Sequence, residues 1–317
     1  MLRTVLLLLL AAVPWTAQAQ QYPAHPVRVL VGFAAGSGPD LQARTIAQQL
    51  ATDLKQSFFI ENRLGANGTI AARAVATAAP DGLTLLFSSS SIAPTPHIYK
   101  SLGYDTLTDL RPIATSGILD GMLVLVDAKS PIKSIADLIA AAKTGRVLYG
   151  SPGVGNVLHL APEMFAQKAG ITLQHVPYKG SSEVANALLS DSVQLMFVTP
   201  VSVIGLVKQG RMRALAFTGT RPFPEFPDVP LLKDLVPGYQ PFGSWGMFYA
   251  PGKTPDDIAN KLNGAIRDAL KVPAVADVMR RDGYVPDNRT AAETAAFFRS
   301  QVEAMGEAVK AAKIAPN

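Results

Sequence analysis

Residues 27–54 read VRVLVGFAAGSGPDLQARTIAQQLATDL and contain a strand, a loop and a helix in that order. Residues 27–32 form an almost uninterrupted aliphatic run, which favours a strand buried on both faces of a sheet. Residues 40–54 form a longer, alanine-rich stretch that is typical of a helix. A glycine-rich turn joins the two elements. This order is typical of an α/β layer built on a largely parallel sheet.

The same alternation continues along the chain and predicts two α/β units. In the first unit we expect further strands at 58–61 and 83–87 and a helix at 70–78. In the second unit we expect strands at 122–126, 147–149, 173–178, 193–198 and 214–218. The helices between them are expected near 135–143, 156–169, 181–189 and 200–209. A connector follows in which prolines oppose helix formation, namely Pro222, Pro224, Pro227, Pro230 and Pro237.

The C-terminal part has one apolar strand, residues 245–250, followed by a run of helices. Capping residues mark the expected helix starts, because their side chains can accept hydrogen bonds from the first backbone amides. These residues are Thr254, the pair Thr290 and Glu293, and, in the second unit, the pair Ser134 and Asp137.

A single strand cannot form a sheet of its own, so this C-terminal part needs a partner. We expect residues 243–317 to pack on the first unit. Lobe 1 then consists of residues 20–120 and 243–317, and lobe 2 of residues 121–242. The chain crosses between the lobes near 115–122 and 238–244, which makes a hinge. Small ligands usually bind in such clefts, and closure about a hinge can bury them.

The composition limits the possible functions. The chain has 317 residues, no cysteine, 48% apolar residues and a formal net charge of +5. This length suits two globular domains. The lack of cysteine excludes disulfide scaffolds, thiol catalysis, thiolate zinc sites and iron–sulfur clusters. Like charges do not form runs, and basic residues do not alternate with aromatic ones, so we expect no nucleic-acid partner.

Residues 1–19 have the pattern of a secretory signal peptide. Arg3 precedes an apolar run over 5–13, and Ala17-Gln18-Ala19 fits a cleavage site. The run is too short for a bilayer core, which needs roughly 20 residues, and a short anchor or core helix is the weaker alternative. We expect a soluble, secreted chain that starts near Gln20. Without a cysteine it carries no lipid anchor, and a monomer is the simplest expectation.

The loop after the first strand, residues 33–40, is the first candidate ligand site. Its glycines let backbone amides approach a ligand, and the following helix start favours negative charge. It is not a P-loop, and Leu41 stands where a dinucleotide-binding motif needs glycine. A plain strand-to-helix turn is an equally good interpretation, and Asp40 suits either a helix N-terminus or a ligand ammonium group. The candidate residues are Phe33, Ala35, Gly36, Ser37, Gly38 and Asp40.

The loop over residues 150–156 is the second candidate and again joins a strand to a helix. Three glycines, a hydroxyl and an amide at a helix start could form a neutral cradle for an oxyanion, phosphate or carboxylate. Pro152 after the serine does not fit the nucleophile elbow of serine hydrolases. His159 suits a structural role better than direct ligand contact. The candidate residues are Ser151, Gly153, Val154, Gly155, Asn156 and His159.

Two further loops follow strands and are expected to converge on the same cleft, because ligands of open α/β sheets bind beyond the carboxyl ends of the strands. Their residues are Ser88, Ser89, Ser90, Tyr178, Lys179 and Gly180. The sequence has no metal-ligand spacing, no nucleophile beside an expected base and no cofactor motif, so we predict binding without metal, cofactor or catalysis. A secreted hydrolase or transferase using Ser151 or His159 is the alternative.

Eight segments of the chain, in order, carry a family resemblance. The first four are YPAHPVRVLVGFAAGSGPDLQAR, ENRLGANGTIAARAVATAAPDGLTLLF, DLRPIA and SPIKSIADLIAAAK. The other four are YGSPGVGNVLHLAPEMF, HVPYKGSSEVANALLSDSVQLMF, GRMRALAFTGTRPFPEFPDVPLL and FYAPGKTPDDIANKLN. Together they span nearly the whole expected mature chain. In these segments the chain resembles the Bug family of extracytoplasmic solute-binding receptors, which serve tripartite tricarboxylate transporters.

The resemblance implies a type II periplasmic-binding-protein fold whose two lobes close on a small organic carboxylate. It implies ligand contacts from the loops named above and, less strongly, from Thr199 and Pro200 at another strand end. The sequence departs from the family where Ser37 separates two glycines, and where Thr199 replaces the acidic or amide residue of many relatives. The implied partners are the membrane components of such a transporter, and a sensor that engages a membrane signalling protein is a further alternative.

Overall fold

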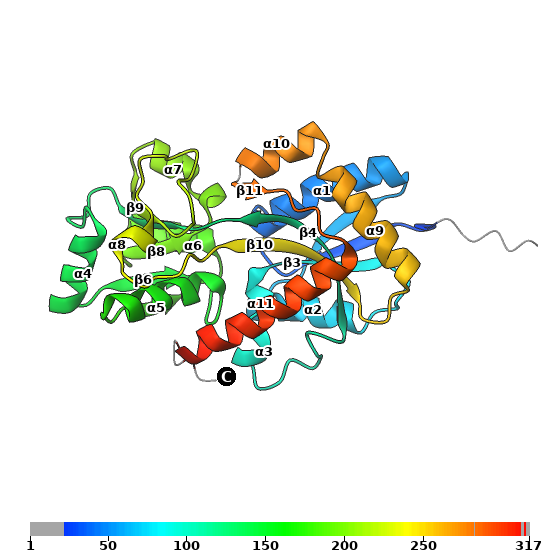
Figure 1. The fold of residues 1–317 in the computed structure, drawn as a ribbon, viewed down its shortest axis with the longest axis horizontal. Coiled ribbons are helices and arrows are strands. Elements are labelled where there is room, and N and C mark those ends of the chain that lie inside the picture. Colours follow the sequence, from blue (N-terminus) through cyan, green and yellow to red (C-terminus); the bar gives the residue numbers. More distant parts are fainter. Residues whose placement is uncertain (1–21, 282, 312–313, 315–317) are drawn as a thin grey trace, which may run out of the picture.

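The computed structural model describes residues 22–281, 283–311 and 314. It contains two β-sheets, each flanked by helices (Figure 1). We call the part that carries the six-stranded sheet lobe 1 and the part that carries the five-stranded sheet lobe 2. The expected signal peptide lies outside the described residues. Within the described ranges, no helix is both long enough and apolar enough to cross a bilayer.

The strands of lobe 1 are β1 Val27–Val31, β2 Phe58–Asn62, β3 Thr84–Ser89, β4 Leu110–Leu119, β10 Ser244–Pro251 and β11 Tyr284–Val285. Their order in the sheet is β11-β4-β10-β3-β1-β2. β1 is parallel to β2 and β3, whereas β10 is antiparallel to β3 and β4. All residues of β10 are buried, which places this late strand at the centre of a sheet begun by the N-terminal part of the chain.

The strands of lobe 2 are β5 Leu123–Asp127, β6 Leu148–Ser151, β7 Gln174–Pro177, β8 Leu195–Val198 and β9 Met212–Phe217. Their order is β7-β6-β8-β5-β9, with β6 parallel to β7 and β8 and with β5 antiparallel to β8 and β9. The expected α/β class is therefore confirmed, and both sheets are mixed. Parallel pairing is retained next to the candidate loops after β1, β3 and β6.

Helices cover both sheets. The longer ones are α1 Gly38–Leu54, α2 Thr69–Ala76, α4 Ile135–Thr144, α5 Val157–Ala169, α6 Ser181–Leu189, α9 Asp256–Ala269, α10 Pro273–Arg281 and α11 Ala291–Ala311. The shorter elements are η1 Ala66–Gly68, η2 Ser90–Ile92, α3 Thr95–Ile98, η3 Pro200–Ser202, α7 Ile204–Lys208 and α8 Leu232–Leu235. The single helix expected at 200–209 is wrong, because Val203 at φ −139° separates η3 from α7.

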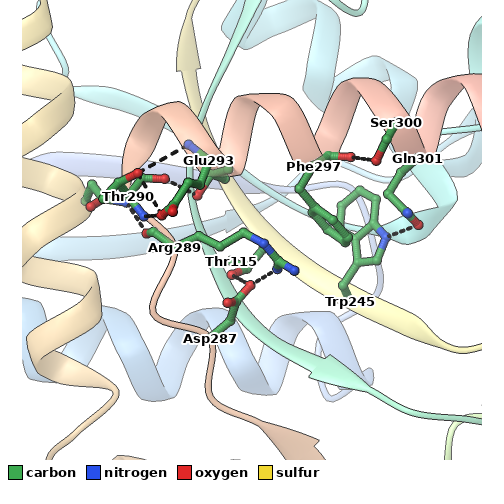
Figure 2. A network of polar contacts seen from close by, with 11 residues as sticks. Thr115, Trp245, Asp287, Arg289, Thr290, Glu293, Phe297, Ser300 and Gln301 are labelled. Atoms are coloured by element: carbon green, nitrogen blue, oxygen red, sulfur yellow. Dashed lines mark hydrogen bonds and ion pairs between the residues drawn. The ribbon is translucent and has the colours of Figure 1, made fainter. Parts of the chain in front are cut away.

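Two of the three expected helix caps are confirmed. Glu293 N donates to Thr290 Oγ1 at 3.3 Å, and Thr290 N donates back to the Glu293 carboxylate at 2.8 Å (Figure 2). Ser134 Oγ likewise accepts from the third amide of α4 at 3.1 Å. The expected cap at Thr254 is wrong: Pro255 holds the N-cap position of α9, and Thr254 Oγ1 is buried without a hydrogen-bond partner among the described residues.

The chain passes from lobe 1 to lobe 2 after β4 and returns before β10. These two strands pair side by side as antiparallel neighbours, so that β4 leads toward lobe 2 and β10 leads back from it (Figure 1). α11 packs on β4 and also reaches α5 of lobe 2. The side chain of Trp245 on β10 fixes α11 to this hinge region, since its indole N–H donates to Gln301 at 3.2 Å and its ring meets Phe297 edge-on at 5.8 Å (Figure 2). The lobe boundaries at 120 and 242 stay a prediction.

Candidate functional site

The first candidate loop connects β1 to α1 and lies against lobe 2. α1 begins at Gly38, so Gly38 and Asp40 belong to its first turn and the preceding residues 33–37 form the loop. A methyl group placed on Gly38 would lie 3.4 Å from Val201 of lobe 2 and 4.0 Å from Thr199 Oγ1. The two lobes are thus in close contact here. Phe33 packs among core residues of lobe 1, whereas Ala35 and Gly36 are exposed.

Asp40 organises this loop from within. Its side chain is 1% exposed. One carboxylate oxygen accepts from Gly36 N at 2.8 Å and from Arg44 Nε at 2.9 Å, and the other accepts from Asn62 Nδ2 at 2.8 Å. The same amide of Asn62 also donates to Phe33 O at 2.9 Å. Burial favours a higher pKa for Asp40, but these hydrogen bonds and the charge of Arg44 outweigh it and lower the pKa. Asp40 is therefore an anion whose partners come from the protein itself.

Ser37 brings a hydroxyl to the start of α1. It occupies the N-cap position, yet its side chain accepts no hydrogen bond from the helix. Its Oγ is buried and has no hydrogen-bond partner within the described residues. The first amides of a helix also lack partners in the helix, which applies to those of Gly38 and Asp40 here. A hydroxyl and the positive end of a long helix thus meet beside the lobe 2 contact at Gly38.

The second candidate loop connects β6 to α5. Ser151 Oγ is hydrogen bonded to His175 Nε2 at 2.7 Å and donates to Gly153 O at 3.0 Å. Several loop amides donate inside the loop: Gly153 N to Ser151 Oγ at 3.3 Å, Asn156 N to Gly153 O at 3.3 Å and Gly155 N to His159 Nδ1 at 2.9 Å. Asn156 caps α5 by accepting from Leu158 N at 2.9 Å. These bonds fix the loop conformation.

Two stacked histidines, His159 of α5 and His175 of β7, lie against this loop and form hydrogen bonds with it. The rings of His159 and His175 lie 4.0 Å apart and nearly parallel, at 20°. Burial lowers the pKa of His159 to about 3, with a smaller contribution from His175, and burial lowers the pKa of His175 to about 4. Both rings are neutral at pH 7. Because Nδ1 of His159 accepts from Gly155 N, its proton sits on Nε2, and His159 acts as a structural acceptor.

The pairing of Ser151 with His175 corrects the expectation that no nucleophile lies beside a base. The two residues are distant in sequence, and the register of β6 with β7 brings them together. The arrangement nevertheless lacks features of a catalytic triad. Ser151 is 0% exposed, and its hydroxyl is engaged by Gly153. Glu163, the acid near these rings, accepts from Tyr149 instead, and burial raises its pKa.

The serine loop after β3 leads into η2. Ser88 is buried at the end of the strand, Ser89 Oγ accepts from Ser91 N at 3.3 Å, and Ser90 is hydrogen bonded through its hydroxyl to Ser244 Oγ at 2.8 Å. Ser244 begins β10. The hydroxyl of Ser90 is therefore tied to the strand by which the chain returns to lobe 1.

The last two loops belong to lobe 2. Tyr178 N donates to Ser151 O at 2.8 Å, which joins this loop to the second candidate loop. Lys179 is exposed, and its amide donates to Glu183 at 3.0 Å, while Gly180 is the N-cap of α6. Thr199 is the N-cap of η3 and lies near Gly38 of the first loop, while the buried Pro200 is the first residue of η3. The structure thus places the loop 33–40 next to residues 199–201, and the loop 150–156 next to Tyr178.

Sequence analysis missed Asn67 in η1, whose side chain forms hydrogen bonds with both lobes. Its side-chain amide donates to Val154 O of lobe 2 at 2.6 Å and to Tyr99 Oη of lobe 1 at 3.2 Å. The sequence does contain an indication, because Gly-Ala-Asn-Gly after a strand favours positive φ angles. Nothing in the sequence could indicate its partner. Among the described residues, no group of three or more histidine, aspartate or glutamate side chains could hold a metal ion.

Comparisons with known proteins agree with this architecture. Residues 42–314 match the family model described as tripartite tricarboxylate transporter family receptor. A UPF0065 protein of Bordetella bronchiseptica is 36% identical over 99% of this chain and 94% of its own. A protein of R. palustris solved with adipate has a TM-score of 0.88 at 31% identity, covering 93% of this chain and 100% of its own. The periplasmic binding protein BugD has a TM-score of 0.86 at 29% identity, with the same coverage.

Proposed function

We propose a function for this chain from its membership of the family of tripartite tricarboxylate transporter receptors. In this proposal the protein captures a small organic carboxylate between its two lobes. It then delivers the carboxylate to the membrane components of such a transporter. The family consists of periplasmic solute-binding receptors. The R. palustris relative holds the dicarboxylate adipate on the same fold. A receptor that binds and releases its ligand unchanged is consistent with candidate loops that carry hydroxyls and helix N-termini.

The observation that carries this proposal is the buried hydroxyl of Ser37, which lacks a partner among the described residues at the N-terminus of α1. A buried hydroxyl without a partner is costly, and a carboxylate oxygen would accept its hydrogen bond. The helix end adds backbone amides and a favourable dipole. We propose that one ligand carboxylate lies here, between the first loop and Thr199 of lobe 2. The remaining candidate residues, at 88–90, 150–156, 159 and 178–180, would form the rest of the cleft.

The charges of the loops restrict the class of ligand. Asp40 would be the natural partner of an ammonium group, but Arg44, Asn62 and Gly36 already occupy its oxygens. Lys179 is the only lysine or arginine in the candidate loops, and its side chain is exposed. A ligand bound here would therefore meet neutral donors at its carboxylates and no counter-ion for an ammonium group. We propose an organic acid without an amino group.

The sequence also supports proposals about location and assembly. We propose that residues 1–19 are removed after Ala19, that the product diffuses in the periplasm without a lipid anchor, and that it is a monomer. We propose the lobe boundaries at 120 and 242 together with this function. Catalysis by Ser151 is the alternative, and the hydrogen bond to His175 is the observation in its favour. Incubation with candidate ligands and simple esters, followed by mass spectrometry, would detect turnover.

Thermal unfolding with a ligand panel tests the function. The protein is first unfolded and refolded to remove carried-over ligand. Matched pairs then separate the ligand classes: succinate against aspartate, and glutarate against glutamate. A ligand at 100 times its Kd should stabilise the folded protein by about 2.7 kcal/mol. We expect the amino-free acid of a pair to stabilise and Ser37→Ala to weaken that effect. Preference for the amino acid would overturn the ligand class, and no response to any carboxylate would overturn the function.

A further inference from the structure

The segment between β2 and α2 has an unusual backbone. Gly65, Ala66, Asn67 and Gly68 all have positive φ angles, at 128°, 46°, 56° and 88°. Glycine adopts such angles without strain and asparagine tolerates them, whereas alanine does so rarely. A Cβ atom on Gly32 at the end of β1 would collide with the backbone of Gly68, so the two segments pack backbone to backbone. This packing holds the tip of the segment in one conformation.

The tip presents the side chain of Asn67 to the opposite lobe. One hydrogen bond of its amide stays in lobe 1, at 3.2 Å to Tyr99 Oη. The other crosses to the second candidate loop, at 2.6 Å to Val154 O. The amide nitrogen has two hydrogens, so both bonds form together and neither competes with the other. Asn67 is therefore oriented by its own lobe while it contacts the other.

Two glycines of the second candidate loop leave room for this contact. A Cβ atom on Gly153 would lie 3.2 Å from Asn67 Oδ1, and one on Gly155 would collide with the side chain of Ile98 in α3 of lobe 1. Both glycines have positive φ angles, at 133° and 76°. Larger residues at either position would hold the lobes apart. The loop that forms part of the candidate ligand cleft thus also forms the contact surface between the lobes.

We propose that Asn67 is an interlobe latch, a positioning residue whose hydrogen bond to Val154 O stabilises the closed state and slows ligand release. The bond joins residues of different lobes, so opening the cleft must break it. A contact made only in the closed state shifts the population toward that state by its own free energy. The inference rests on the proposed function for the identity of the ligand. Closure itself is measured without any ligand.

Asn67→Gly removes the latch, because glycine keeps the φ angle of 56° and removes the side chain together with its bonds to Val154 O and Tyr99 Oη. The affected bond should be worth about a 3- to 10-fold change in an equilibrium or rate constant. We expect the ligand dissociation rate, measured by stopped flow, to rise by that factor while the association rate is unchanged. Asn67→Asp should raise it further, because a carboxylate oxygen would face the carbonyl of Val154.

Tyr99→Phe is the matched control. It removes the partner of Asn67 inside lobe 1 and leaves the bond between the lobes, so the dissociation rate should stay within about twofold of wild type. If Tyr99→Phe reproduced the effect of Asn67→Gly, ordering of the loop within lobe 1 would explain both, and the latch would be refuted. An unchanged dissociation rate in Asn67→Gly would refute it equally.

The ligand-free measurement uses the absence of native cysteine. Spin labels at Gln48→Cys on α1 and Lys143→Cys on α4, both exposed, report the distance between the lobes. Asn67→Gly should reduce the closed fraction in this background, with or without ligand. Equal distance distributions in the variant and its parent, or a parent that never closes, would overturn the latch. A failure of the whole ligand panel would leave these distances readable and would refute the proposed function alone.

Discussion

Asp40→Asn tests whether this carboxylate organises the first loop. The substitution preserves the size of the side chain but keeps only one acceptor oxygen. In the native loop both oxygens accept hydrogen bonds, from Gly36 N, Arg44 Nε and Asn62 Nδ2, at 2.8 to 2.9 Å. The new NH2 group must point at one of these donors. The variant therefore loses at least one bond outright and weakens the others by removing the charge.

The expected loss of stability follows from these contacts. A hydrogen bond to a charged group contributes about 1.5–3 kcal/mol. The ion pair adds only about 0–1 kcal/mol, because the Arg44 side chain is 47% exposed and screened by solvent. We expect Asp40→Asn to lower the free energy of unfolding by about 2–4 kcal/mol at pH 7. Arg44→Met removes the hydrogen bond from Arg44 Nε but leaves those from Gly36 and Asn62, so it should cost less than Asp40→Asn, about 1–2 kcal/mol.

The pH dependence gives this prediction a definite sign. The pKa of Asp40 is lowered in the folded protein, despite burial, by the hydrogen bonds from Arg44, Asn62 and Gly36. Its contribution is therefore fully present above the unfolded pKa of about 3.9 and is lost as the pH falls through the lower folded value. Urea unfolding followed by circular dichroism measures both. A variant within about 0.5 kcal/mol of wild type at pH 7, or a difference that persists unchanged at pH 2, would refute the reasoning.

Three further predictions address binding and pH. Gly153→Asp should abolish binding in a ligand titration, because φ is 133° at this position and the new side chain would meet Asn67. The circular dichroism spectrum of the variant should stay native. An unaltered affinity would contradict this prediction. Trp245 is the one tryptophan outside the expected signal peptide, and it lies at the hinge beside a cavity of about 680 Å³. Its fluorescence emission should therefore change when a ligand closes the lobes. An unchanged emission spectrum in a protein that binds its ligand would contradict motion at this hinge. Burial lowers the pKa values of His159 and His175, so the free energy of unfolding should fall as the pH drops below about 6.5. The loss should be about 2 kcal/mol or less for each residue at pH 5. In urea unfolding, His159→Phe should make the free energy of unfolding less dependent on pH.

Continuous apolar runs predicted most strands correctly, because a strand buried on both faces leaves that pattern. β4 escaped detection although it is the longest strand. Arg111 and Pro112 interrupt its start, Thr115 and Ser116 its middle, and Gly117 its end. Its irregular register with β10 explains why such residues are tolerated there. The register shifts of β4 against β10 mark bulges, and bulges remove the simple alternation that sequence analysis detects.

The positions of the candidate loops were predictable, whereas their interactions were not. Glycines before a helix indicated loops at 33–40 and 150–156, and both segments do join a strand to a helix. The hydrogen bond of Ser151 to His175 depends on strand register, and that of Asn67 to Val154 spans 87 positions between lobes. Asp40 illustrates the limit most clearly. Its position at a helix start suited two roles, and only the donors from Gly36 and from β2 decide between them.

If the proposed function holds, these interactions make closure of the lobes the main source of affinity. Amides of the second loop are largely used within that loop, the charge of Asp40 is paired with Arg44, and both histidines are neutral at pH 7. A carboxylate in an open, hydrated cleft would therefore gain little from the remaining donors. Hydrogen bonds strengthen when the lobes meet and water is excluded, because the local dielectric constant falls. On the proposed function, contacts between the lobes, such as those of Asn67 and Gly38, would therefore set how tightly the neutral loops hold an anion.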